Sequence, residues 1–137
     1  MKGLINDDRD IILSMSAPRI LIVEDEVVVA MYIETVLSSF GFDVVGTVTN
    51  GEDAQRVVRE NSPDLVLMDI NIEGDYDGIE TTRRIKSFSS VLVIFVSAYI
   101  DKETKERAKD TQPAGYLAKP FKNKELRDII NDTLAKA

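Results

Sequence analysis

A short, purely apolar run that ends in an acidic residue constrains this chain more than any other feature. Leu65–Met68 has no polar face, and Asp69 follows it directly. An apolar run without alternation is typical of a strand buried on both sides, as in parallel sheets with helices on each face. Such sheets bind ligands at the carboxyl ends of their strands. Asp69 is therefore either a loop cap or the centre of a site.

The rest of the chain alternates between apolar runs and helical patterns. Further strands are predicted at 19–23, 43–48, 91–96 and 114–118. Helical spacing of apolar residues follows the strands from near residues 27, 50, 77 and 123, and a charged fourth helix would lie at 101–110. This order predicts an α/β fold, namely a doubly wound, five-stranded parallel sheet with right-handed crossovers and helices on both faces.

The predicted helices differ in how firmly an apolar face would hold them. The first and third helices carry apolar-face residues at helical spacing: Val27, Ala30, Met31, Val36, Leu37 and Phe40, and then Ile79, Thr82, Ile85 and Phe88. Segment 101–110 is almost entirely charged, and only Ala108 could anchor it. Since packing of an apolar face supplies most helical stability, we expect this segment to be held weakly.

Composition excludes several classes of function. The length of 137 residues is typical of one domain, and the net charge of −7 argues against binding to a nucleic-acid backbone. The chain contains no Cys and no His, which excludes disulfide scaffolds, cysteine or histidine metal sites and Ser-His-Asp or Cys-His catalysis. The longest apolar run is too short to span a bilayer, and no signal peptide is evident. We expect a cytoplasmic protein that binds neither nucleic acid nor membrane.

The domain boundary is predicted near Pro18. Residues 1–17 are expected to be an N-terminal extension, either a disordered, frayed terminus or one short helix, and residues 18–137 the folded domain. Met1 precedes the domain and nothing follows Ala137, which favours a stand-alone domain that acts by binding over a piece of a longer protein.

Polar residues follow four of the predicted strands. Glu24 and Asp25 follow the first strand, Asp69 the third, Ser97 the fourth and Lys119 the fifth. The carboxyl ends of parallel strands lie at one edge of the sheet. If the strand order is 2-1-3-4-5, as in flavodoxin-like folds, the first and third strands are neighbours. They meet at the topological switch point, where the order of the strands in the sheet reverses direction. The three acids would then share one crevice.

Three crowded carboxylates repel one another unless a cation lies among them. Mg²⁺ fits, because it prefers oxygen ligands and is commonly bound by carboxylates together with phosphate oxygens. Lys119 could neutralise part of a phosphoryl group, and Ser97 could hydrogen-bond one of its oxygens. The combination favours a reaction in which Asp69 attacks phosphorus and becomes an aspartyl phosphate. Each residue alone has a plainer explanation, as a turn cap, a helix-dipole partner or a solvated charge.

Residues 19–136 resemble the receiver domain of two-component response regulators, such as the chemotaxis receiver. The matching stretches, in chain order, are 20–26, 64–69, 77–80, 96–98 and 115–121. The resemblance implies a flavodoxin-like fold and a Mg²⁺-dependent phosphoacceptor. It also implies no enzyme activity beyond phosphotransfer to the domain's own aspartate and autodephosphorylation.

The same resemblance implies a role for each site residue. Asp69 is the phosphoacceptor, Lys119 contacts the phosphoryl group, Ser97 and Tyr116 are the switch pair, and Glu24, Asp25, Asp69 and the backbone carbonyl of Asn71 hold Mg²⁺. The implied donor is a histidine kinase or phosphotransfer protein, and a downstream protein target would bind the 101–121 face. A cis bond before Pro120 is also expected.

Three alternatives stay open at this point. A degenerate receiver would keep the fold and act only as a binding module. A Mg²⁺-dependent aspartyl-phosphate phosphatase of the haloacid dehalogenase type would need an Asp-x-Asp pattern after the first strand, which Glu24-Asp25-Glu26 does not supply, and a cap over its substrate. A flavodoxin-like cofactor binder would need a phosphate-binding loop where this acidic triplet would repel phosphate.

Overall fold

A computed structural model describes residues 17–137 of the chain. Within them, five strands form one parallel sheet in the order β3-β2-β4-β5-β6. The strands are β2 (Arg19–Val23), β3 (Asp43–Val48), β4 (Leu65–Met68), β5 (Leu92–Ser97) and β6 (Gly115–Ala118). Counted along the chain, this order is 2-1-3-4-5, so the predicted sheet is confirmed. The prediction of a frayed terminus or short helix before residue 17 lies outside the described residues.

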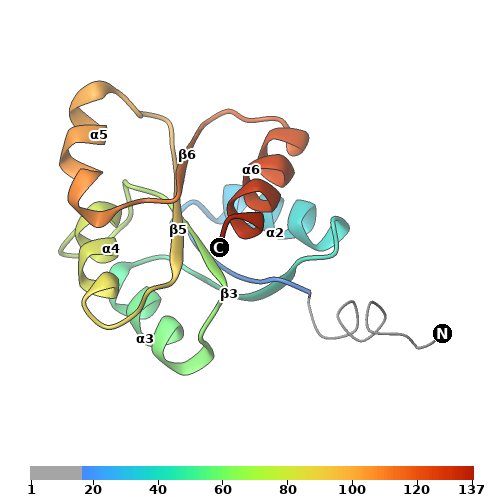
Figure 1. Cartoon of the computed structure of the whole chain (residues 1–137), viewed down its shortest axis with the longest axis horizontal. Helices are drawn as coiled ribbons and strands as arrows, with labels where there is room; N and C mark the ends of the chain where they lie inside the picture. Colours follow the sequence, from blue (N-terminus) through green and yellow to red (C-terminus); the bar gives the residue numbers. More distant parts are fainter. Residues whose placement is uncertain (1–16) are drawn as a thin grey trace.

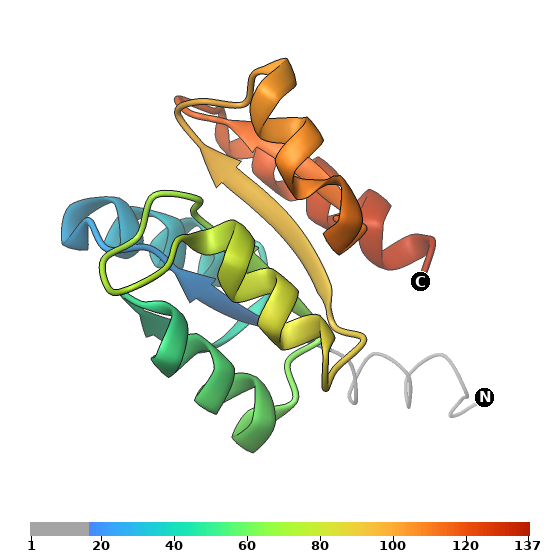
Figure 2. The ribbon, with the colours of Figure 1, turned by 90° about the vertical axis from the view of Figure 1, so that its left-hand side faces the viewer.

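Helices cover both faces of the sheet, as predicted. One face carries α2 (Val27–Ser39) and α6 (Asn123–Ala135), and the other carries α3 (Gly51–Asn61), α4 (Gly78–Lys86), α5 (Lys102–Ala108) and the 3-10 turn η1 (Lys109–Thr111) (Figure 1). Figure 2 shows α3, α4 and α5 side by side over the second face. In the part of the chain that the structure describes, no helix has the length and apolar character needed to cross a membrane.

Alternate strand residues build the two halves of the core. Ile20 and Ile22 of β2 lie in a cluster with apolar residues of α2 and α6, whereas Leu21 and Val23 lie in a cluster with apolar residues of α3 and α4. All residues of β4 are buried, as its purely apolar sequence predicts. Because this strand is held from both sides, the position of Asp69 at its end is held as well.

Local capping signals start and end helices where the sequence predicts. Asn50 Oδ1 accepts the Asp53 N–H at 2.9 Å at the start of α3, and Asp77 Oδ1 accepts the Glu80 N–H at 2.9 Å at the start of α4. Gly41 follows α2 with φ of +87°, a conformation that favours glycine after a helix. These caps satisfy backbone groups that the helix itself leaves unpaired.

One part of the predicted core is wrong. The spacing of Val27 and Met31 predicts burial, but their side chains are 66% and 62% exposed. The buried stripe of α2 is instead Ala30, Ile33, Val36 and Leu37. Apolar residues lie on both sides of this helix, so its pattern fits two stripes and the sequence alone does not choose between them. Phe88 is also exposed, because α4 ends at Lys86 and Phe88 is no longer part of its apolar face. Its ring contacts the Arg59 guanidinium.

Gly78 permits a close approach between α4 and the end of β4. Its N–H donates to the backbone oxygen of Ile70 at 2.7 Å. A Cβ at this position would lie 2.0 Å from the backbone oxygen of Asp69. Any larger residue would therefore displace the backbone that carries Asp69.

Gly78→Ala is expected to lower the free energy of unfolding by about 1–3 kcal/mol, the usual cost of overpacking a well-packed position. Urea unfolding followed by circular dichroism measures this loss. Gly46→Ala is the matched control, because a Cβ there would meet Leu21 at 3.4 Å, an ordinary contact. Equal free energies of unfolding for Gly78→Ala and the wild type would contradict the proposed clash.

Ion pairs link α4 to α5 and to the 3-10 turn η1 that follows it. Ala108 is the single buried residue of α5, as the sequence predicts. Arg107 donates to Asp77 at 2.7 Å, and Arg83 donates to both carboxylate oxygens of Asp110 at 2.8 and 3.0 Å. Burial alone would raise the pKa of Asp77, but a backbone hydrogen bond and the Arg107 guanidinium lower it below its ordinary value. Each such exposed pair is worth about 0–1 kcal/mol.

Arg107→Gln is expected to speed hydrogen exchange of the α5 amides several-fold, while changing the free energy of global unfolding by less than about 1 kcal/mol. Lys109→Gln is the matched control, because Lys109 makes no ion pair within residues 17–137. In the wild type, the Arg107–Asp77 ion pair should be fully formed at pH values above 3.8, the ordinary pKa of Asp. It should be lost as the pH falls through the lowered pKa of Asp77. The same α5 exchange rates in both variants would exclude a holding role for Arg107.

Candidate functional site

The carboxyl ends of the strands bring four charged side chains together. Glu24 and Asp25 follow β2, Asp69 follows β4, and Lys119 follows β6. Carboxylate oxygens of the three acids lie within 4.8 Å of one another. The acids meet because β2 and β4 are hydrogen-bonded neighbours although a helix, a strand and another helix separate them in sequence.

Backbone hydrogen bonds between strand ends hold these positions. The Asp69 N–H donates to the Val23 oxygen, the Glu24 N–H to the Val48 oxygen and the Lys119 N–H to the Ser97 oxygen, each at 2.9 Å. Each of these residues thus continues the hydrogen bonding of the sheet beyond the last strand residue. The site therefore has the rigidity of the sheet.

Lys119 is the cation of this crevice. Its Nζ donates to Glu24 Oε1 at 2.6 Å and to Asp69 Oδ2 at 3.2 Å. Glu24 is 2% exposed and Asp69 is 6% exposed, while 16% of the Lys119 side chain is exposed. Because buried charges are costly unless they are paired, the lysine offsets part of the cost of burying the two acids. The Lys119–Pro120 bond is cis, as predicted.

Burial and the neighbouring charges shift the pKa values of Glu24 and Lys119 in the same direction. Burial raises the pKa of Glu24 above its ordinary value, and the hydrogen bond from Lys119 only partly opposes this. Burial would lower the pKa of Lys119, but the hydrogen bond to Glu24 and the charges of Asp69 and Glu24 outweigh it and raise that pKa. Lys119 therefore stays protonated, and the acids would gain from a further cation.

The loop after β4 contacts Asp69 through Asn71. The Asn71 N–H donates to Asp69 Oδ1 at 3.2 Å, so each Asp69 carboxylate oxygen has a hydrogen-bond donor. The family resemblance implies that the Asn71 backbone carbonyl binds the metal, and that role stays a prediction. The N–H contact is an additional feature that the sequence did not indicate.

Ser97 and Tyr116 make their side-chain contacts with residues other than the four charged ones. Ser97 is fully buried at the end of β5, and its Oγ accepts the Tyr99 N–H at 3.4 Å. The Tyr116 ring is partly buried; its centre lies 5.9 Å from that of Phe95 and 5.3 Å from Lys105 Nζ. Burial raises the pKa of Tyr116. The structure thus brings Glu24, Asp25, Asp69 and Lys119 together, and the switch role of Ser97 and Tyr116 stays a prediction.

Sequence reasoning missed two features of the site. One is the exposed apolar surface at the start of α2, which borders a groove that reaches Lys119. No sequence signal could separate these residues from the buried stripe of the same helix. The other is the close approach of Gly78 to Asp69, for which the Asp77-Gly78 pair at a helix start was an available signal.

Comparison with known proteins identifies the family. The sequence model of the response regulator receiver domain matches residues 20–131. Chemotaxis protein CheY of Bacillus subtilis is 35% identical over 119 residues, which cover 86% of this chain and 98% of CheY. Sporulation initiation phosphotransferase F of the same organism is 32% identical over 121 residues, 88% of this chain and 96% of that protein.

A longer relative and a solved structure agree with this match. Transcriptional regulatory protein PdtaR of Mycobacterium tuberculosis is 32% identical over 82% of this chain, but the chain spans only about half of that relative's length, 54%. The signal receiver domain of a modulated diguanylate cyclase from Desulfovibrio desulfuricans G20 is 39% identical with a TM-score of 0.82, covering 88% of this chain and 96% of that chain. From the strand order, the family match and these relatives, the chain belongs to the response regulator receiver domains of two-component signalling.

Proposed function

We propose that the chain is a phosphorylation switch, in which Asp69 accepts a phosphoryl group and the domain then changes a partner-binding surface. The arrangement around the Asp69 carboxylate carries this proposal. It is nearly buried, both of its oxygens accept hydrogen bonds, and two further carboxylates lie within 4.8 Å. A turn cap would need only the contact with the Asn71 N–H. The contact with Lys119 and the two nearby carboxylates are expected if a charged group binds here.

The donor set fits Mg²⁺. Three carboxylates face one lysine in a mostly buried crevice, which leaves an excess of negative charge. Anionic oxygens in that arrangement are what a small, hard cation prefers. The proposed ligands are Glu24, Asp25, Asp69 and the backbone carbonyl of Asn71. When bound, the ion supplies positive charge that offsets the charge of the phosphoryl oxygens.

The phosphoryl group would come from another protein, because this chain contains no His. A carboxylate oxygen of Asp69 attacks the phosphorus of a phosphohistidine on a histidine kinase or phosphotransfer protein. A P–O bond forms, the P–N bond breaks, and the imidazole nitrogen keeps the electron pair. Lys119, which is paired with Glu24 and Asp69 before the transfer, then donates to a phosphoryl oxygen.

The exposed apolar surface at the start of α2 is the proposed docking site of that donor. Val27, Val28 and Met31 are 66%, 79% and 62% exposed. They adjoin a groove lined by Val28, Val29, Tyr32, Ala98, Lys119, Pro120 and Phe121. Exposed apolar patches commonly mark protein interaction sites. Because Lys119 both lines the groove and contacts Asp69, a donor helix seated here would hold its phosphohistidine beside the acceptor.

The proposed signal passes from Asp69 to the 101–121 face. The bond between Ser97 Oγ and the Tyr99 N–H is long, 3.4 Å, and a phosphoryl oxygen would be a stronger partner for this hydroxyl. Movement of Ser97 would leave space for the partly exposed ring of Tyr116 to turn inward. The weakly anchored α5 packs beside that ring and would shift with it. This is a local charge change acting on an element with two positions.

Incubation with Mg²⁺ and acetyl phosphate is expected to add a single, labile phosphoryl group, seen as one adduct in the intact mass. Asp69→Asn should abolish the adduct, whereas Asp75→Asn, an exposed acid in the same loop, should keep it. Removing Mg²⁺ with EDTA should lower the rate of adduct formation at least about tenfold, because the excess negative charge would then repel the donor.

Other results of the same experiment discriminate between the alternatives. No adduct, together with no binding of Mg²⁺, would contradict the proposal and indicate a degenerate receiver that acts only by binding. Steady release of phosphate over many turnovers would indicate a phosphatase. Adduct formation in Asp69→Asn would place the acceptor elsewhere.

Ser97→Ala is expected to leave phosphorylation of Asp69 possible but to reduce the accompanying amide shifts of residues 101–116 in NMR spectra. The reason is that the hydroxyl is the proposed link between the phosphoryl group and Tyr116. Ser90→Ala, at an exposed position before β5, is the control and should respond like the wild type. An undiminished response of 101–116 in Ser97→Ala would rule out this coupling.

A further inference from the structure

The loop between β4 and α4 returns to its own starting point. The Gly78 N–H donates to the Ile70 oxygen at 2.7 Å, so residues 71–77 leave the sheet and come back beside Asp69. Asn71, whose backbone carbonyl is a proposed ligand of Mg²⁺, is the first residue of this excursion. A loop tied only at its two ends would leave the orientation of this peptide group variable. The contacts that hold the rest of the loop therefore decide how well the carbonyl is placed.

Glu73 holds the middle of the loop against the segment that joins β3 to α3. It forms an isolated parallel β-bridge with Asn50, and its carboxylate accepts the Thr49 hydroxyl at 2.7 Å. The chain bends at the next residue, Gly74, whose φ of +107° is a conformation that favours glycine. The side-chain contact is exposed, and water competes with it. These polar contacts therefore hold the loop less firmly than packing would.

Tyr76 supplies packing near the end of the loop. The guanidinium carbon of Arg84, on α4, lies 3.8 Å from the centre of the Tyr76 ring. The hydroxyl accepts a hydrogen bond from Gln55 Nε2, on α3, at 2.6 Å. One edge of the ring lies so close to Gly51, at the start of α3, that a Cβ there would be 2.4 Å from Tyr76 Cε2. The ring is thus held by α4 on its face and by α3 at its edge and its hydroxyl.

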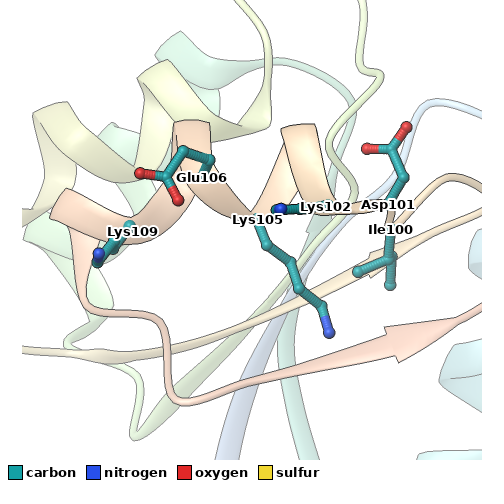
Figure 3. Close-up of a pocket in the computed structure, with 6 residues that line it drawn as sticks. All are labelled: Ile100, Asp101, Lys102, Lys105, Glu106 and Lys109. Atoms are coloured by element: carbon teal, nitrogen blue, oxygen red, sulfur yellow. The ribbon is translucent and has the colours of Figure 1, made fainter.

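The cation–ring contacts at Phe88 and Tyr116 are more open than the one at Tyr76. An arginine guanidinium carbon lies 4.0 Å from the centre of the Phe88 ring, but Phe88 is 37% exposed. Lys105 Nζ lies 5.3 Å from the centre of the Tyr116 ring, and this lysine lines a hollow on α5, from which it extends toward β6 (Figure 3). At exposed sites such a contact contributes little by itself. Tyr76 differs because a second helix encloses the same ring.

We propose that Tyr76 is a positioning residue for the metal site. By fixing the loop to α3 and α4, its ring sets the orientation in which the Asn71 carbonyl is offered to Mg²⁺. The inference rests on the proposed function, because the ion and its Asn71 ligand belong to that proposal. A ligand that is held in place before binding loses less conformational freedom when the ion binds, which raises the affinity. Residues that orient a metal ligand without touching the ion commonly change metal affinity about 10–100-fold.

The first measurement is made without metal. NMR order parameters of the backbone amides of residues 71–76 report how firmly the loop is held in the isotope-labelled protein. Tyr76→Ala is expected to lower these order parameters. Tyr76→Phe should retain them, because it loses only the hydrogen bond from Gln55 and keeps the ring between α3 and α4. Phe88→Ala is the matched control, since it removes another ring that contacts an arginine but lies outside the loop.

The second measurement is the affinity for Mg²⁺, determined by isothermal titration calorimetry. Tyr76→Ala is expected to raise the Kd for Mg²⁺ about tenfold, whereas Tyr76→Phe and Phe88→Ala should stay within about twofold of the wild type. A purely structural role of Tyr76 would lower the free energy of unfolding, which urea unfolding measures, and would leave the Kd of the folded protein unchanged. If Tyr76→Ala does not fold, Arg84→Ala removes the contact on the ring face and is expected to shift both measurements in the same direction.

Three other outcomes would overturn the inference. Wild-type order parameters in Tyr76→Ala would show that the ring does not hold the loop. A loosened loop with an unchanged Kd for Mg²⁺ would show that the placement of Asn71 is of no consequence for the ion. A wild-type protein that does not bind Mg²⁺ would overturn the proposed metal site and this inference together. The last outcome is distinguishable from the first two because it is seen in the wild type, before any variant is compared.

Discussion

Three carboxylates and one lysine share a crevice where the neighbouring strands β2 and β4 end. The parallel sheet and the helices packed on it keep these four side chains close together. Buried like charges oppose one another, so Glu24, Asp25 and Asp69 could not stay together on flexible loops. Continuation of the sheet hydrogen bonding through Glu24, Asp69 and Lys119 keeps the backbone from relaxing apart. The negative charge that remains is the charge that the proposed metal ion would offset.

The stability of the domain is distributed unevenly around this crevice. β2 and β4 are packed on both faces. Gly78 allows the start of α4 to lie close to the backbone of Asp69. In α5, by contrast, Ala108 is the single buried residue, and α5 and η1 are linked to α4 by exposed ion pairs worth little each. The acidic site is thus held by well-packed strands, whereas α5 is anchored by few contacts, as the proposed switch would need.

Two surfaces of different character flank the crevice. The start of α2 is apolar and adjoins Lys119, while the outer side of α5 is basic and adjoins Tyr116. They lie on elements that cover opposite faces of the sheet, so partners with different chemistry can contact the domain without competing for the same residues (Figure 1). The apolar surface is the one proposed above as the docking site of the phosphodonor.

The sequence by itself determined the alternation of strands and helices, the burial of β4, the weak anchoring of α5 and the chemical types at the strand ends. These follow from local patterns, because the apolar period and the capping residues are short-range properties. The sequence also predicted that the three acids share one crevice, on condition that the strand order is 2-1-3-4-5. Only the tertiary structure decided that Lys119 is bound to Glu24 as well as to Asp69. It also decided that Val27 and Met31 are exposed and that Arg107 bonds Asp77. These contacts depend on which strands are neighbours and which side of a helix meets the sheet, and both are set by packing between segments far apart in the chain.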